Sequence, residues 1–317
     1  MKVRKERRGL HFYDRITGLH ILADEVRIPR ENRDEGPEII SIAVTNVCDL
    51  SCAFCYAPKS RHMLSVPEIV HWCRELDQLG TLEVAFGGGE PTLLPGLAEA
   101  CQTIWTNTRL GISITTHGHH LNEQLWEKLK GFISIVRVSI DAPEPLYSSI
   151  RGLPLARAIK NIRQMDGQVP LGINTVVNTQ TLGRLEELTV VVRDLGAIDW
   201  LLLPEIKNGK FTLSDSEWHR LDNWIISRSN DLSLRTTANA KAHLTGPFLL
   251  DDEPEDYAHI SANGYLRRSS YESTGISLRD RSSMLIALQE LKMCRNWPQC
   301  VNGLAERHWR RTGLHSR

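Results

Sequence analysis

The chain has 317 residues, of which 41% are hydrophobic and 24% are charged, as expected for a globular protein with one large domain or a domain with appendages. Lys plus Arg and Asp plus Glu each total 38, and this balance argues against binding of nucleic acid or an anionic membrane through overall charge. No apolar run approaches the roughly 20 residues of a membrane span, and no apolar segment of a signal peptide follows the basic N-terminus. We therefore expect a cytoplasmic protein, whose seven cysteines are more typical of free thiols or metal ligands than of disulfides.

Residues 1–38 are expected to form an N-terminal hairpin and linker. Two short extended runs within 11–23 flank a turn that ends at Gly18, which predicts a β-hairpin. Such a hairpin can offer an edge to which a peptide adds as a strand, although capping of a barrel is its commoner role. Segment 29–37 is charged and contains glycine and proline residues, so we expect it to be a linker. The basic residues near both ends are interpreted as solvated tails, namely Lys2, Arg4, Lys5, Arg7, Arg8, Arg307, Arg310 and Arg311.

Between residues 39 and 209, apolar strand-like runs alternate with amphipathic helix-like segments. The strands are predicted at 39–45, 82–86, 110–116, 134–140, 171–177 and 198–203, and the helices at 66–79, 97–106, 122–130, 155–165 and 182–195. A capping box from Ser65 to Glu68, with a proline in the first turn, supports the first helix. This alternation is typical of βα units with a parallel sheet. Six units are too few for a closed eight-unit barrel, so the fold class is α/β, as an open barrel or a doubly wound sheet with ligands at the carboxyl ends of the strands.

Residues 210–317 are expected to form a mixed C-terminal region that is associated with the substrate. The alternation stops after Gly209, and the later segments predict helices at 214–227 and 282–292 and strands at 232–236 and 259–268. An acidic segment occupies 251–256.

Three cysteines, Cys48, Cys52 and Cys55, follow the first strand within eight residues and can converge on one metal centre. Thiolate ligands favour zinc, copper(I) or iron–sulfur. A structural zinc site normally has four protein ligands, for which His62 and Cys73 are the alternatives to consider. Three cysteines leave one iron of a [4Fe–4S] cluster open to another ligand. The spacing alone favours iron–sulfur over zinc and over ordinary buried thiols.

The Cys-x3-Cys-x2-Cys spacing, followed by the aromatic Tyr56, resembles the radical SAM superfamily, and the resemblance extends over about residues 39–205. It implies a partial (β/α)6 TIM-like barrel. Gly87–Pro91 resembles the Gly-Gly-Glu-Pro segment of that family, which implies that Gly88, Gly89 and Glu90 bind the methionine amino group of S-adenosylmethionine (SAM). Glycines let the backbone approach a ligand closely, and Glu90 adds a negative charge for an ammonium group.

The same resemblance implies further contacts with SAM, at Tyr56, Thr116, Ser139, Arg151 and Asn174. Thr115–Gly118 and Ser139–Asp141 resemble elements at the ends of the third and fourth strands, although His117 departs from the usual asparagine. Arg151 is implied to pair with the SAM carboxylate, with a loop-positioning role as the alternative. Asn174 is implied to reach the adenosine, with a satisfied polar position in the sheet as the alternative.

The implied chemistry uses a [4Fe–4S] cluster on Cys48, Cys52 and Cys55 to cleave SAM reductively. The resulting 5′-deoxyadenosyl radical abstracts a hydrogen atom from the substrate, and an external donor such as a flavodoxin or ferredoxin supplies the electron. No catalytic acid, base or hydrogen donor is identified. Asp141, His117 and Glu205 are candidates only because they lie at strand ends.

The overall likeness is to peptide-modifying maturases whose C-terminal SPASM or twitch region holds auxiliary clusters. Residues 260–270 resemble the opening hairpin of such a region but contain no cysteine, so we expect a degenerate version without an auxiliary cluster. Cys294 and Cys300 are the cysteines of the C-terminal third, and Cys73 and Cys101 are expected to be buried in helices.

The expected substrate is therefore a ribosomally made peptide or a protein. A radical SAM enzyme that acts on a small molecule or nucleotide is the alternative, and a zinc- or cluster-binding interaction module is a more remote one. Neither a membrane nor a nucleic acid is an expected partner.

Overall fold

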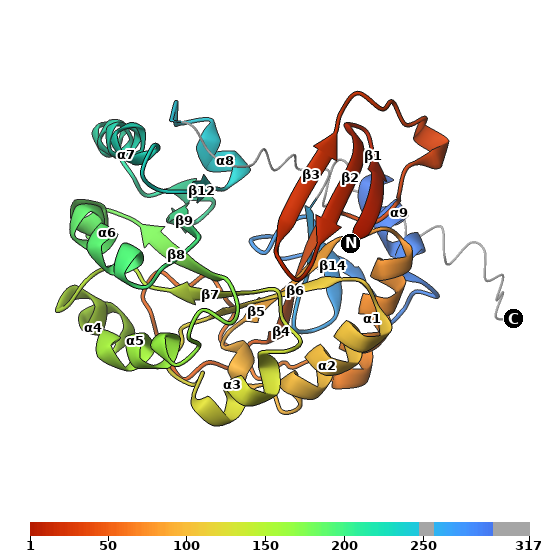
Figure 1. Ribbon diagram of the computed structural model, residues 1–317, viewed down its shortest axis with the longest axis horizontal. Helices are drawn as coiled ribbons and strands as arrows, with labels where there is room; N and C mark the ends of the chain where they lie inside the picture. Colours follow the sequence, from red (N-terminus) through yellow and green to blue (C-terminus); the bar gives the residue numbers. More distant parts are fainter. Residues whose placement is uncertain (247–256, 294–317) are drawn as a thin grey trace, which may run out of the picture.

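The computed structural model describes residues 1–246 and 257–293 (Figure 1). The predictions for the acidic segment, for Cys294 and Cys300 and for the basic cluster at 307–311 lie outside the described residues. Among the helices that are described, none combines the length and the apolar character needed to cross a membrane.

The N-terminal segment forms a three-stranded antiparallel sheet in the order β1-β2-β3, with bounds Lys2–Glu6, Gly9–Asp14 and Leu19–Ala23. The predicted hairpin is confirmed as β2 and β3, but β1 was not predicted. The expectation of a solvated basic tail is wrong for Lys2 and Arg4, because the alternation of β1 turns both inward. Lys2 Nζ lies 2.7 Å from Asp77 Oδ1, and Arg4 Nη1 donates to the Gly80 carbonyl over 3.1 Å.

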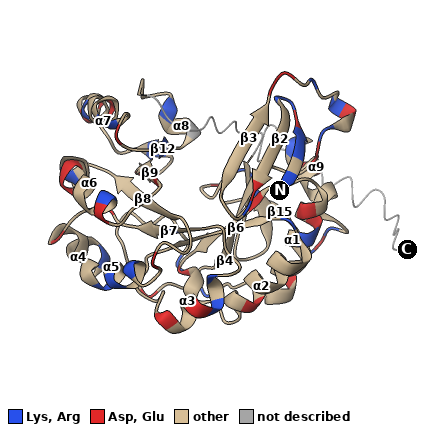
Figure 2. Cartoon of the chain, in the orientation of Figure 1, with Lys and Arg blue, Asp and Glu red and all other residues tan. Residues whose placement is uncertain are grey.

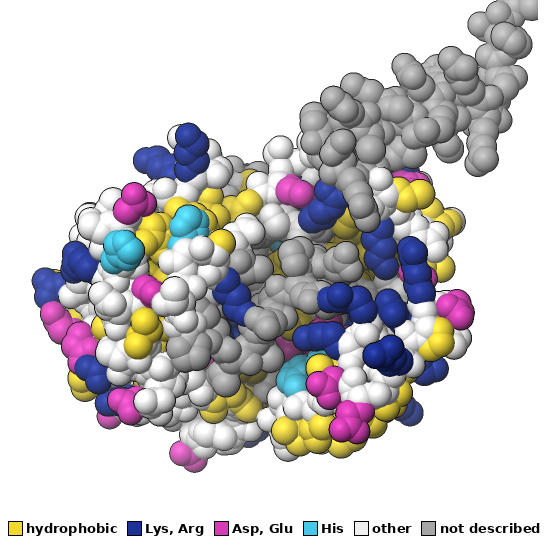
Figure 3. Space-filling model, turned by 90° about the horizontal axis from the view of Figure 1, so that it is seen from above, with side chains coloured by type: hydrophobic (Ala, Val, Ile, Leu, Met, Phe, Trp, Pro, Cys, Tyr) yellow, Lys and Arg dark blue, Asp and Glu magenta, His cyan; other side chains and the backbone are white. Residues whose placement is uncertain are grey.

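These contacts place the N-terminal sheet against the segments that precede the main strands. Tyr13 of β2 packs so closely on the start of β6 that a Cβ on Gly111 would lie 1.9 Å from its hydroxyl oxygen. Seen from above, Lys and Arg side chains gather on the side of the molecule where Figure 1 places this sheet (Figure 3).

The main sheet has ten strands in the order β12-β9-β8-β7-β6-β5-β4-β13-β14-β15. Its six central strands are parallel and follow the predicted runs closely, as β4 (Ile39–Thr45), β5 (Glu83–Gly88), β6 (Gly111–Thr116), β7 (Ile135–Ser139), β8 (Leu171–Val177) and β9 (Asp199–Pro204). Over the described residues the sheet does not close on itself, and this confirms the prediction of a partial α/β barrel.

The helices of the βα units cover one face of this sheet (Figure 1). They are α1 (Val66–Gln78), α2 (Leu97–Asn107), α3 (Glu123–Leu129), α4 (Leu146–Arg151), α5 (Leu155–Arg163) and α6 (Leu185–Asp194), with short 3-10 turns η1 (Arg30–Asn32), η2 (Pro91–Leu93) and η3 (Leu182–Arg184). The capping box of Ser65 and Glu68 is confirmed at the start of α1. The short helix α4 was not predicted. Both signs of charge are interspersed over the outer surface of these helices (Figure 2).

The C-terminal residues extend the same sheet at both of its edges. They form β10 (Ile206–Lys207), β11 (Lys210–Phe211), α7 (Asp215–Arg228), β12 (Leu234–Thr236), α8 (Ala238–Lys241), β13 (Tyr257–Ile260), β14 (Tyr265–Arg267), β15 (Ile276–Ser277) and α9 (Met284–Met293). Strand β12 pairs with β9, and β13 pairs with β4, in both cases in parallel. The strands predicted within 259–268 are present as the β13–β14 hairpin, in which the chain turns back at Gly264, whose φ of +82° suits glycine. This agrees with the hairpin expected at 260–270.

The core lies between the sheet and its helices. Ile112, Val136 and Ile173 of the central strands are fully buried there. Cys73 and Cys101 lie in α1 and α2, are also fully buried, and confirm the prediction of buried thiols. The packing of this core fixes the carboxyl ends of the central strands, from which the candidate site is built.

Candidate active site

The cysteine loop, residues 46–62, leaves the carboxyl end of β4 without regular secondary structure. Its two ends are joined, because the Asn46 N–H donates to the His62 carbonyl over 2.9 Å. Cys48, Cys52 and Cys55 lie on this loop as half-buried free thiols. The Leu50 N–H points at Cys48 Sγ over 3.4 Å, as is common for a backbone amide beside a ligating sulfur.

Burial acts on two of the three thiols. Burial raises the pKa of Cys48 and also that of Cys52. The charge of Arg151 lowers the pKa of Cys52 and so opposes this rise, whereas the charges of Asp141 and Cys55 add to it. Because metals bind thiolates, occupation of this site by a metal releases protons.

The Gly88–Glu90 segment is bonded directly to the start of the cysteine loop. The Gly89 N–H donates to the Thr45 carbonyl over 2.7 Å, and the Glu90 N–H donates to the Val47 carbonyl over 2.8 Å. A Cβ on Gly88 would lie 2.1 Å from the Thr45 oxygen, and one on Gly89 would lie 2.3 Å from the Val47 oxygen. Both glycines are therefore required by the approach of two backbone segments, in addition to any approach of a ligand.

This close approach predicts a large difference between neighbouring glycines. Gly88→Ala should lower the free energy of unfolding by roughly 2–4 kcal/mol, because Gly88 has a φ of +122° and the new methyl group meets backbone. Gly87→Ala is the matched control, since a Cβ added at Gly87 would have no other atom within 4 Å. Urea denaturation of both variants measures the difference, and equal stabilities would contradict the assigned contact.

The carboxylate of Glu90 is only 1% exposed and joins the ends of β5 and β6. Its Oε1 accepts from the Thr92 N–H at 3.1 Å, from Thr92 Oγ1 at 2.5 Å and from Thr116 Oγ1 at 2.6 Å. Its Oε2 accepts from the His117 N–H at 2.9 Å. The structure thus brings Glu90 and Thr116 together, with the Glu90 carboxylate bonded to neighbouring groups of the protein.

A link between the cysteine loop and the end of β6 was not predicted. Asp49, between two of the cysteines, lies 3.0 Å from His117 Nε2 and 2.8 Å from His120 Nε2. His117 Nε2 also lies 3.3 Å from Glu90 Oε2. An acid inside the cysteine triplet and a run of histidines directly after a predicted strand were the signals in the sequence, but only the fold shows that they meet.

Arg151, at the end of α4, is oriented by Asp141. Its Nε and Nη2 lie 2.7 and 2.6 Å from Asp141 Oδ2, and its guanidinium carbon lies 5.8 Å from the ring centroid of Phe54. Asp141 is itself fixed by the Val176 N–H, which donates to Oδ1 over 3.0 Å. This carboxylate is therefore a positioning group for Arg151.

The remaining predicted residues have other neighbours in the structure. Ser139 ends β7 and is paired in register with Asn174 of β8. The Asn174 side-chain oxygen accepts from Arg137 over 3.2 Å, which agrees with a polar position in the sheet. Tyr56 is 54% exposed and its ring lies 4.8 Å from that of Tyr271, in the C-terminal region. Glu205 accepts from Asn178 Nδ2 over 2.9 Å.

A pocket of about 210 Å³ opens beside the cysteine loop, between that loop and the β13–β14 hairpin. Its lining includes Asn46, Tyr56, Gly88, His259 and Arg267. Arg267, one of these lining residues, has its Nε buried without a hydrogen-bond partner.

The donors on the cysteine loop fit a cluster with one open iron. Three soft thiols lie on one loop, and the other described cysteines, Cys73 and Cys101, are buried in the helical core. Cys48 Sγ, an oxygen of Asp49 and a nitrogen of His117 also lie within 4.8 Å of one another, so a smaller metal ion has mixed ligands nearby.

Comparison with known proteins identifies the family of this region. Residues 42–189 match the family described as the radical SAM superfamily. The chain is 24% identical over 222 residues to the AdoMet-dependent heme synthase of Methanosarcina barkeri, covering 65% of this chain and 63% of that protein. It is 24% identical over 277 residues to the GTP 3′,8-cyclase of Haemophilus influenzae, covering 76% of this chain and 80% of that protein.

A solved structure has the same fold. SuiB of Streptococcus suis, bound to its precursor peptide SuiA, superposes with a TM-score of 0.67 at 17% identity, over 80% of this chain and 65% of SuiB. The chain thus spans less than two thirds of the heme synthase and of SuiB.

Proposed function

Because this chain carries a radical SAM domain, from a superfamily whose members are enzymes, we propose that it cleaves SAM reductively at a [4Fe–4S] cluster. The observation that carries the proposal is the bonding of the cysteine loop to the Gly88–Glu90 segment at the carboxyl end of the sheet. In the proposed function this contact would hold the loop with the three cysteine ligands next to the segment that binds SAM.

In this proposal Cys48, Cys52 and Cys55 hold the cluster. Together, the bound cluster and SAM supply a deoxyadenosyl radical that takes a hydrogen atom from the substrate. Asp141 orients Arg151 beside the cysteines, and the guanidinium has further N–H groups with which to bind a carboxylate. The Glu90 carboxylate accepts hydrogen bonds from Thr92, Thr116 and His117, and these bonds hold the SAM-binding segment in place. Its negative charge also attracts an ammonium group. An external flavodoxin or ferredoxin supplies the electron.

We propose a peptide or protein as the substrate, modified by the core at 39–209 and recognised by the segments 1–38 and 210–317. Two observations support a peptide. The SuiB fold, whose solved complex contains a precursor peptide, extends over most of this chain. In addition, β3 is the outer strand of its sheet and exposes Leu19 and Ile21 by about half, which suits the addition of an extended peptide.

A small-molecule substrate is the second candidate. It is favoured by the curated relatives, which are named as a heme synthase and GTP 3′,8-cyclases. The pocket beside the cysteine loop, whose lining includes the polar residues Asn46, His259 and Arg267, suits a compact polar ligand equally well.

Anaerobic reconstitution tests the common part of both candidates. The full chain, supplied with iron and sulfide, should bind about four irons and absorb broadly near 400 nm. After reduction with dithionite it should convert SAM into 5′-deoxyadenosine, measured by chromatography with mass detection. A protein that binds iron but forms no deoxyadenosine above the level of free SAM and dithionite would contradict the proposed reaction.

The substrate class is tested with the same reconstituted protein. It is incubated separately with GTP and with synthetic peptides encoded by short reading frames beside its gene. A peptide that raises deoxyadenosine formation and changes in mass, or takes up deuterium from solvent, supports the first candidate. Stimulation by GTP alone contradicts it and supports the second.

A further inference from the structure

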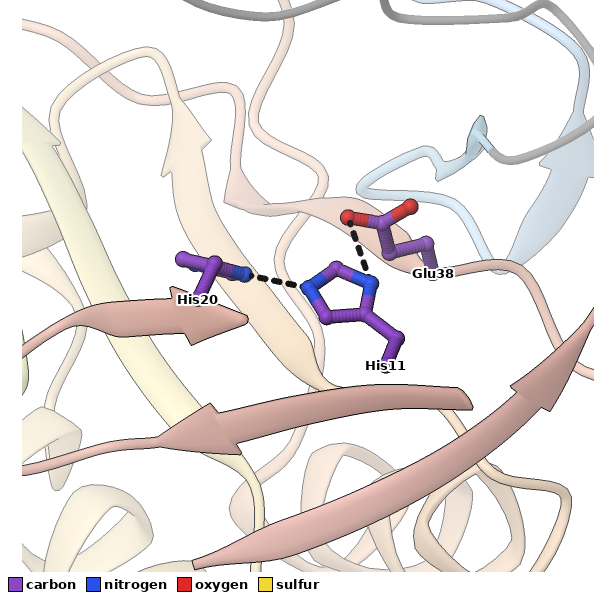
Figure 4. A group of neighbouring side chains, drawn as sticks. All are labelled: His11, His20 and Glu38. Carbon is purple, nitrogen blue, oxygen red and sulfur yellow. Dashed lines mark hydrogen bonds and ion pairs between the residues drawn. The ribbon is translucent and has the colours of Figure 1, made fainter. Parts of the chain in front are cut away.

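A second cluster of metal-ligating side chains lies at the other end of the sheet (Figure 4). His11 is on β2, His20 is on β3, and Glu38 directly precedes β4. One ligand atom from each lies within 4.8 Å of the other two. Cys48 follows β4, so the seven residues of this strand, roughly 20 Å in length, separate this cluster from the cysteine loop.

Pairing within the N-terminal sheet brings the two histidines together. His11 pairs with Leu22 and Tyr13 pairs with His20, so the two histidines are diagonal neighbours on one face. His11 Nε2 lies 2.9 Å from His20 Nδ1. The opposite ring nitrogen of His11 points toward Glu38, as Figure 4 shows.

This opposite nitrogen, His11 Nδ1, is buried and has no hydrogen-bond partner. It lies 3.7 Å from Glu38 Oε1 and 3.7 Å from Glu6 Oε2. A neutral imidazole carries one N–H, and when Nε2 donates it to His20, Nδ1 presents a lone pair to two carboxylates. In a buried site this arrangement favours a positive charge between these groups, supplied by a proton on Nδ1 or by a metal ion.

Arg8 fixes both carboxylates of this site through the oxygens that are not directed at His11. Arg8 Nε binds the other oxygen of Glu6 over 3.0 Å, and Arg8 Nη2 binds the other oxygen of Glu38 over 3.1 Å. These bonds hold the inner oxygens toward His11. Arg4 Nε donates to Glu6 Oε2 over 3.4 Å, and Arg4 Nη1 donates to the Gly80 carbonyl over 3.1 Å.

We propose that His11 Nδ1, Glu38 and Glu6 bind a divalent transition-metal ion of the zinc class, with His20 as the hydrogen-bond partner that fixes the tautomer of His11. Ligand atoms around tetrahedral zinc are about 3.3–3.5 Å apart, so the 3.7 Å spacings contract only slightly on binding. A metal-bound histidine usually donates its other N–H to such a partner. The ion would join β1, β2 and the start of β4 and so fasten the N-terminal sheet to the barrel.

The test uses the full chain in two forms. In the first, the iron–sulfur protein is reconstituted, passed over a chelating resin and given one equivalent of zinc. Elemental analysis should find one zinc per chain in addition to the iron. In the second, Cys48, Cys52 and Cys55 are all replaced by serine to remove competing thiolates, and the protein is titrated with cobalt(II), whose visible bands report coordination by nitrogen and oxygen.

Two substitutions at the site carry the result. These are His11→Gln and the isosteric Glu38→Gln, which should each weaken zinc binding at least tenfold. A third variant, His20→Ala, tests the supporting residue and should weaken zinc binding about 10- to 100-fold through loss of the hydrogen bond to His11. His71→Gln is the matched control, because His71 lies exposed on α1 and should leave zinc affinity unchanged. Circular dichroism checks that each variant is folded. If His11→Gln does not fold, Glu38→Gln decides alone.

Two results would overturn the proposal. One is a folded chain that takes up no zinc beyond the amount bound by the cysteines. This result means that a proton on His11 Nδ1 bridges the two carboxylates in place of a metal. The other is zinc affinity that Glu38→Gln leaves unchanged. Neither bears on the proposed SAM chemistry, whose readout is deoxyadenosine.

Discussion

Cys52→Ala should abolish both cluster binding and cleavage of SAM while leaving the fold intact. The expected loss is from about four irons per chain to background, because two thiolates do not retain a cluster that needs three from the protein. Deoxyadenosine formation should fall to that of SAM and dithionite alone. The fold should survive because Cys52 lies half-buried on a loop outside the sheet and its helices.

Cys101→Ala provides the matched control. This cysteine is fully buried in α2, away from the loop, and its loss should cost some stability but no iron. Iron content, the absorption near 400 nm and deoxyadenosine yield are measured for both variants after the same reconstitution. Retention of iron and activity by Cys52→Ala would show that the assignment of the ligands is wrong.

Glu90→Ala should have two separable effects. The first is on stability. The carboxylate accepts four hydrogen bonds in a site that is 1% exposed, and its removal leaves the His117 N–H and the hydroxyl of Thr116 without their acceptor. We expect the free energy of unfolding to fall by roughly 3–5 kcal/mol. Urea denaturation of the protein without its cluster measures this loss.

The second effect is on SAM. Removal of Glu90 frees the Gly88–Glu90 segment from β6 and removes a negative charge from beside the cysteine loop, so SAM affinity should fall by at least about tenfold. The iron content should fall less, since Glu90 is not a cysteine ligand. Calorimetric titration of the reconstituted variant with SAM measures the affinity. Glu99→Ala, at an exposed carboxylate on α2, is the control, and equal affinity in the two variants would refute the role of Glu90.

In the C-terminal region the sequence predicted the helix and the strand that follows it, but not where that strand pairs in the sheet. The helix expected at 214–227 and the strand expected at 232–236 are present as α7 and β12, within two residues of their predicted limits. Their position at one edge of the barrel sheet, with β13 at the other, was not visible in the sequence. Pairing of β13 with β4 joins residues more than 200 positions apart. A short apolar run does not identify a partner strand that is so distant in the sequence.

The local features of this protein were determined by its sequence. The six central strands and the cap of α1 follow from residues that are neighbours in the chain, because hydrophobic periodicity and capping act over a few residues. The cysteine triplet is a feature of the same kind, since its spacing within one loop already indicates a common ligand.

The tertiary structure alone decided how charged and polar side chains are paired. The inward-facing Lys2 and Arg4 of β1, the bond network of Glu90 and the approach of His11 to Glu38 all join segments that are distant in the chain. A buried charge is tolerated only where the fold supplies a partner, and that partner is set by the packing of whole elements. The same residues in the sequence were equally compatible with a solvated surface.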